Sequence, residues 1–160
     1  MTLPINDESS GPWAALRYEF WTLERSIQEK GRLDEQSFQD EDRLQVMKGA
    51  LTESAVLHAR RLCELFANPE GKFDSDLNLS DLLPDWDWDK SKYKVLNELL
   101  SAIETAYGHY SEANSPYQTL NRIFWQATVT RPSAQDYADA LDKVLPLLRR
   151  IIAEVESRQR

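Results

Sequence analysis

Apolar residues recur at intervals of three and four along most of the chain, and strict alternation over five or more residues is rare. This spacing places apolar side chains along one side of a helix. Only 5 Gly and 7 Pro occur among 160 residues, so few positions interrupt the periodic stretches and the elements should be long. The pattern predicts an all-α protein, a five-helix antiparallel-type bundle with one long acidic loop.

Two long helices are expected in the first half of the chain. The first covers about Trp13–Lys30 and ends at Gly31, because glycine readily takes the left-handed conformation that closes a helix. The second begins somewhere between Asp34 and Asp40 and continues to Ala67, where an Asn-Pro pair and a glycine follow.

The second predicted helix is apolar over an arc of about 120° at the usual rotation of about 100° per residue. The positions on this arc are Leu44, Met47, Leu51, Ser54, Ala55, His58, Leu62, Leu65 and Phe66. From Ala55 onward the opposite side is apolar as well, with Val56, Leu57 and Cys63. A helix that is apolar nearly all round is surrounded by other elements, so we expect this part of it at the centre of the bundle.

Residues 68–92 form the least regular stretch, in which aspartates alternate with Leu and Trp. We interpret this stretch as a long acidic loop with one short helical turn around Ser80–Leu83. A loop that is wholly solvated would not carry these apolar side chains, so we expect its Leu and Trp residues to lie over the bundle.

Three further helices complete the predicted bundle. One covers about Lys92–Glu112, and the next begins after Ser115, where a Ser-Pro-x-Gln sequence has the residues of a helix N-terminus, and ends near Thr130. The last begins at Ser133, and we expect Pro146 to kink it.

Charge and composition exclude several classes of function. The chain has 19 Lys and Arg against 27 Asp and Glu, a net charge of −8, which disfavours nucleic acid and anionic membranes as partners. Its single cysteine excludes an internal disulfide, and no apolar run approaches the roughly 18 residues of a membrane span. Residues 1–10 lack the basic and apolar regions of a secretory signal, so we expect a flexible lead-in at 1–10, one domain at 11–160 and a cytoplasmic protein.

Metal, cofactor and catalytic motifs are not evident. The acidic runs 74–78 and 85–89 have the spacing of the first calcium ligands, but neither continues with the glycine and the glutamate that an EF-hand requires. His58, His109 and Cys63 are too few for a transition-metal site. The chain has no Gly-rich phosphate loop and no nucleophile elbow. We therefore expect no metal, no cofactor and no catalytic residue.

A polar strip in the second helix is the strongest candidate for a functional site. His58 lies in the middle of the apolar arc, and Glu53 and Arg60 share another side of the helix. A buried imidazole must find a partner, so His58 is either a structural residue bonded to a carbonyl or carboxylate of a neighbouring helix, or part of a binding site. The candidate binding residues are Glu53, His58, Arg60, Arg61 and His109.

The partner of His58 decides its protonation. The arc around it contains no acidic residue, which favours a neutral, hydrogen-bonded imidazole. Should a carboxylate reach it, with Glu53, Glu104 and Glu112 as the candidates, the charged form is favoured instead.

The run Leu57-His58-Ala59-Arg60-Arg61-Leu62, preceded by Glu53 and followed by Phe66, resembles the second-helix signature of uncharacterised bacterial helical proteins. These are grouped loosely with the HEPN (higher eukaryotes and prokaryotes nucleotide-binding) superfamily. The resemblance covers about 14 residues and implies a helical bundle that often dimerises. Catalytic members are metal-independent ribonucleases with an Arg, then four to six intervening residues, then a His. Here positions 51–53 and 102–104 hold no Arg.

The function that these observations favour is that of a non-catalytic helical bundle acting by protein–protein contact. Its partner would be another protein or a second copy in a homodimer, and the resemblance suggests regulation or bacterial stress or defence as the context. The alternative is a HEPN-like enzyme that cleaves RNA or binds nucleotides, with His58, Arg60, Arg61 and His109 in an atypical site.

Overall fold

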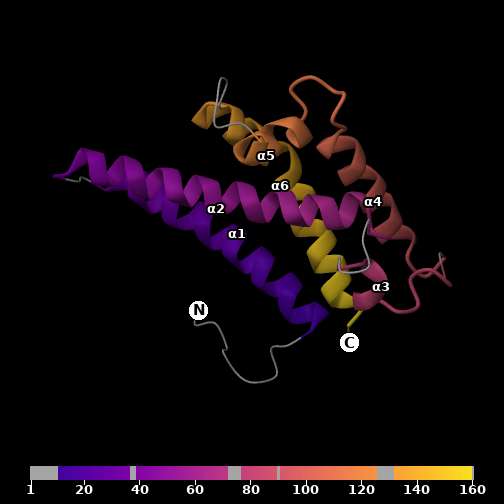
Figure 1. The fold of residues 1–160 in the computed structure, drawn as a ribbon. Coiled ribbons are helices and arrows are strands. Elements are labelled where there is room, and N and C mark those ends of the chain that lie inside the picture. Colours follow the sequence, from indigo (N-terminus) through magenta and orange to yellow (C-terminus); the bar gives the residue numbers. More distant parts are fainter. Residues whose placement is uncertain (1–10, 37–38, 72–76, 90, 126–131, 160) are drawn as a thin grey trace.

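In the computed structural model, which describes residues 11–36, 39–71, 77–89, 91–125 and 132–159, the chain is an all-α bundle (Figure 1). The described residues contain no strand. The helices are α1 (Pro12–Glu35), α2 (Glu41–Ala67), α3 (Leu79–Leu82), α4 (Lys94–Tyr107), α5 (Pro116–Trp125) and α6 (Ala134–Ser157). Five of them are long and α3 is a single turn, which confirms the predicted fold class.

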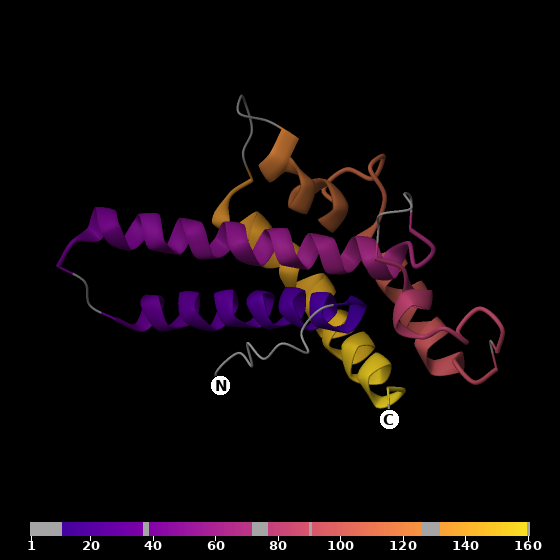
Figure 2. The same cartoon turned by 60° about the horizontal axis from the view of Figure 1, so that its bottom comes forward.

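Helices α1 and α2 form a long antiparallel hairpin, and one end of it extends beyond the rest of the bundle (Figures 1 and 2). The predicted end of the first helix was wrong, because α1 continues through Gly31 to Glu35. Packing of Leu33, which is buried, outweighs the low helix propensity of glycine at that position. The side chain of Asp40 accepts a hydrogen bond from the Arg43 backbone N–H at 2.9 Å and so caps α2.

The two halves of α2 have different environments. No residue of its first half, 41–54, is buried, whereas eight residues between Ala55 and Phe66 are. Helices α4, α5 and α6 pack on α2 and on one another. The prediction that α2 becomes central from Ala55 onward is therefore confirmed.

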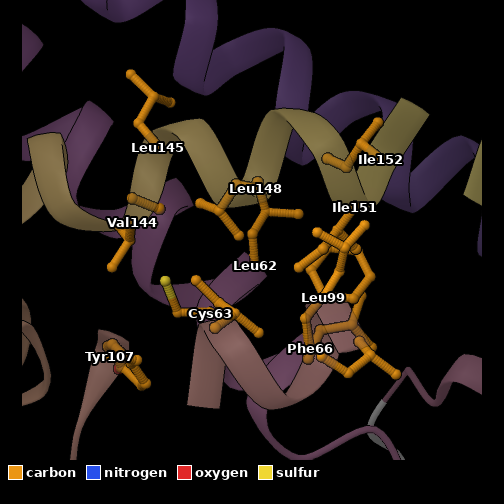
Figure 3. Packing of buried hydrophobic residues seen from close by; sticks show 14 of the residues in the cluster. Leu62, Cys63, Phe66, Leu99, Tyr107, Val144, Leu145, Leu148, Ile151 and Ile152 are labelled. Atoms are coloured by element: carbon orange, nitrogen blue, oxygen red, sulfur yellow. The ribbon is translucent and has the colours of Figure 1, made fainter. Parts of the chain in front are cut away.

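The core of the bundle lies between the second half of α2, α4 and α6. Figure 3 shows side chains from these three helices converging, with Leu62 and Phe66 of α2 facing Leu148 and Ile151 of α6. These four side chains are buried almost completely. The core is apolar because each of these helices brings an apolar stripe of spacing three and four to the same place.

The predicted acidic loop carries α3, at the place where a short helical turn was expected. Leu79, Leu82 and Leu83 are buried, and Leu77 is partly buried and packs against the core. Trp86 is partly buried and packs against the core, as expected. The expectation that both tryptophans lie over the bundle was wrong for Trp88, because this side chain is 88% exposed.

The remaining helix ends follow from local sequence. Helix α4 ends at Tyr107, earlier than predicted, because Gly108 takes a φ of 77°. The Ser115 hydroxyl accepts from the Gln118 N–H at 3.2 Å at the start of α5, and the predicted extension of that helix to Thr130 falls outside the described residues. A capping box of Ser133 with its N3 aspartate begins α6.

Pro146 lies inside α6, which is continuous from Ala134 to Ser157. The predicted lead-in, residues 1–10, also lies outside the described residues. In the part of the chain that the structure describes, no helix combines the length and the apolar character needed to cross a membrane.

Candidate functional site

His58 occupies the buried side of α2, as predicted, and only 6% of it is exposed. Its ring nitrogen Nδ1 lies 2.5 Å from Oε2 of Glu19, which comes from α1. The expectation that no acid reaches His58 was wrong. It considered only the arc of α2, whereas the carboxylate belongs to the neighbouring helix and is none of the three glutamates named above.

The carboxylate of Glu19 joins two residues of α2. Its other oxygen, Oε1, accepts a hydrogen bond from Nη1 of Arg61 at 2.9 Å. The ring of Tyr18 meets the His58 ring edge to face, with the centroids 5.8 Å apart and the planes at 80°. Glu19, His58 and Arg61 therefore form one polar layer across the α1–α2 interface, which we call the Glu19 layer.

Two further polar contacts cross the same interface at the same antiparallel register. The Ser26 hydroxyl donates to the Ser54 hydroxyl at 2.8 Å. Nearer the tip of the hairpin, Lys48 forms an ion pair with Asp34 at 2.6 Å, and this hydrogen bond holds the pKa of Asp34 below its ordinary value. The interface between α1 and α2 is thus partly polar along its length.

The other predicted site residues do not join the Glu19 layer. Glu53 is exposed on α2, and Arg60 forms an ion pair with Glu64 one turn along the same helix at 2.9 Å. His109 is exposed in the segment after α4, where its Nδ1 lies 3.1 Å from the Ser111 hydroxyl. Of the five candidates, the structure brings only His58 and Arg61 together.

The geometry at His58 resembles the orienting contact of a general base. A carboxylate on one imidazole nitrogen fixes the ring and leaves the other nitrogen for a proton. Such a base also needs a nucleophile or a substrate beside it. Cys63 does not supply one, because it packs in the core of the bundle (Figure 3) and burial raises the pKa of its thiol far above the ordinary value.

In the acidic loop, the carboxylate of Asp85 is bonded to side chains of the same chain. Asp85 accepts hydrogen bonds from the Lys92 ammonium and the Tyr93 hydroxyl, which lower the pKa of Asp85. Residues 74–76 of the other acidic run lie outside the described residues. Within the described residues, no three or more His, Cys, Asp or Glu side chains gather closely enough to hold a metal ion.

Glu19 is the site residue that sequence reasoning missed. A signal for it exists, because Glu19 lies three residues after Leu16 and four before Leu23, both fully buried on the side of α1 that faces the interior. A charged residue at such a position needs a partner across the interface. On α2, His58 was the buried polar residue that needed such a partner.

Comparison of the chain with protein-family models, with curated proteins and with solved structures finds no match. The fold and the side-chain geometry therefore carry the functional argument.

Proposed function

We propose that the protein acts by binding another protein, or a second copy of itself, and not by catalysis. The observation that carries this proposal is the first half of α2, which extends with α1 beyond the bundle (Figure 2). It has apolar residues at Leu44, Met47 and Leu51, yet none of its side chains is buried. Val46 is 72% exposed.

A pair of helices that packs only on itself leaves much of its apolar surface in water. Where such a pair extends from a bundle, a partner helix or a second hairpin is what completes the burial. The candidate reactive groups support the same function, because the His58 imidazole and the Arg61 guanidinium are both bonded to the Glu19 carboxylate. A role in regulation or in bacterial stress or defence rests on the sequence resemblance alone.

The test compares two exposed valines. Val46→Asp places a charge on the projecting part of the hairpin, and Val95→Asp places the same charge on α4, where Val95 is 50% exposed. Light scattering at high micromolar concentration, together with chemical cross-linking in extracts of the native host, would measure association. We expect the wild type and Val95→Asp to exceed the 18.5 kDa monomer or to form a cross-linked adduct, and Val46→Asp to lose it.

The proposal would be contradicted if the wild type is a monomer by light scattering and forms no cross-linked adduct that Val46→Asp removes.

A second function, RNA cleavage or nucleotide binding at an atypical HEPN-like site, is favoured by the Glu19 carboxylate that orients His58. An enzyme acting on RNA brings its cationic groups together in one open positive site. Here Arg60 and Arg61 are paired with carboxylates, and His109 makes its contacts in a separate segment. Incubating labelled RNA with the wild type and His58→Ala tests this function, which predicts cleavage or binding by the wild type only.

A further inference from the structure

The turn of residues 84–89, between α3 and α4, carries two tryptophans in opposite environments. Trp86 is partly buried and donates its indole N–H to Oδ1 of Asn97 on α4 at 2.9 Å. Trp88 is the most exposed large apolar side chain of the described residues. An indole left in water at one defined place is the kind of side chain that dominates protein interfaces.

The backbone around Trp88 is held in place by hydrogen bonds. The N–H groups of Trp88 and Asp89 donate to the Asp85 carbonyl oxygen at 3.2 and 3.1 Å. The Asp85 side chain ties the turn to Lys92, and Oδ1 of Asp89 accepts from the Lys92 N–H at 3.1 Å. Because the turn is already ordered, a partner that covers Trp88 has little chain entropy to remove.

Charge indicates which kind of partner fits this turn. Trp88 lies between Asp87 and Asp89 in the sequence, and the whole chain carries a net charge of −8. The face of an indole is the best aromatic site for a Lys or Arg cation, and a field of this sign draws cationic partners toward it. Lys92, which follows the turn, is already paired with Asp85.

We propose that the exposed Trp88, on its ordered turn and beside Asp87, is the docking point for an arginine- or lysine-bearing segment of a partner protein. This inference rests on the proposed protein-binding function and names a second surface for it. A cationic side chain lies over the Trp88 ring, and the Asp87 carboxylate accepts its hydrogen bonds.

A synthetic peptide of alternating Arg and Gly, twelve residues long, serves as the probe, with Glu-Gly and Ser-Gly peptides of equal length as its controls. Binding at low salt is followed by the anisotropy of the labelled peptide and by the indole N–H resonance of Trp88. We expect the Arg-Gly peptide alone to bind and to shift that resonance. Trp88→Ala should weaken binding at least fivefold, and Asp87→Asn should weaken it less.

Tyr110→Ala is the matched control, because Tyr110 is an aromatic residue 66% exposed in a different segment, after α4. It should bind the peptide as the wild type does. Equal binding by Trp88→Ala and the wild type would mean attraction to the net charge only, and would overturn the proposal. So would a wild type that does not bind the Arg-Gly peptide.

The two proposals fail separately. If the wild type shows no association that depends on Val46 but binds the peptide through Trp88, the hairpin is overturned as an interface and the Trp88 surface remains. Retained association with no peptide binding overturns the Trp88 surface and leaves the protein-binding function.

Discussion

The interior of the bundle and the interface between α1 and α2 are built differently. In the interior, α2, α4 and α6 meet through side chains such as Phe66, Ile103 and Leu148, none of which is exposed. In the hairpin, the interface includes the Glu19 layer and the pair Ser26–Ser54. Apolar contacts contribute most of the stability, but they can form at several registers of one helix against the other. A polar layer has its hydrogen bonds satisfied at one register only. The interior therefore stabilises the fold, and the hairpin interface defines its own register.

The largest effect that separates the two regions is expected from cavity formation. Leu148→Ala empties a fully buried site in the interior and should lower the free energy of unfolding by about 2–5 kcal/mol. Leu44→Ala, the same change in the projecting part of the hairpin, should cost much less because Leu44 is only partly buried. Urea unfolding of both variants measures the difference. Equal losses would mean that the two regions are packed alike.

Removing the shared carboxylate comes next. Glu19→Ala leaves His58 and Arg61 without their acceptor and should cost about 1–3 kcal/mol. Glu29→Ala on the same helix is the control. Among the described residues Glu29 pairs with exposed arginines, so this change should alter stability by about 0–1 kcal/mol. Thermal melts of the two variants provide the comparison, and indistinguishable curves would place the Glu19 layer among surface contacts.

Replacing the Glu19 layer and the Ser26–Ser54 pair together should affect the register of α1 against α2 more than the stability. The variant Glu19→Leu, His58→Leu, Ser26→Ala and Ser54→Ala keeps the interface filled but lets the helices slide. Spin labels at Glu29→Cys and Ala50→Cys should show one narrow distance in the parent and a broadened one in this variant. Cys63 stays unlabelled, because burial raises the pKa of its thiol and excludes the reagent. A distribution that stays narrow would show that apolar packing alone sets the register.

The smallest effect is expected at the edge of the bundle, in the turn around Asp85. Hydrogen bonds from Lys92 and then Tyr93 lower the pKa of Asp85. The stabilisation is therefore present above the unfolded pKa of about 3.9 and is lost as the pH falls through the lower folded pKa. The indole N–H resonance of Trp86 should hold its position down to about pH 4 and move below that value. In Asp85→Asn it should already be displaced at neutral pH.

The sequence-based predictions succeeded where the feature depends on residues within a few positions, and failed where it depends on another helix. Asp40, Ser115 and Ser133 each act within one turn of their own helix, and the helices begin at or next to them. Gly31 was misassigned as a helix end because glycine can also continue a helix, and α1 runs on past it to bring in the buried Leu33. The exposure of Trp88 was missed because composition cannot tell which of two tryptophans in a turn meets α4.

The candidate site shows the same difference between local features, which the sequence predicts, and contacts between helices, which it does not. The spacing of apolar residues was enough to place His58 on the buried side of its helix. It was not enough to pair Arg61 with Glu19, because that contact joins residues 42 positions apart. Within α2 alone, Arg60 and Arg61 were equivalent candidates, and only the position of α1 distinguishes them.

The sequence by itself determined that this protein is helical, where its long helices lie and which side of each is apolar. These properties follow from a periodicity of three and four and from capping residues that act within a few positions. Only the tertiary structure decided that α1 and α2 extend beyond the bundle, that Glu19 bonds both His58 and Arg61, and that Trp88 remains in water. Each of these depends on which helix faces which, and that is settled by packing the whole chain at once.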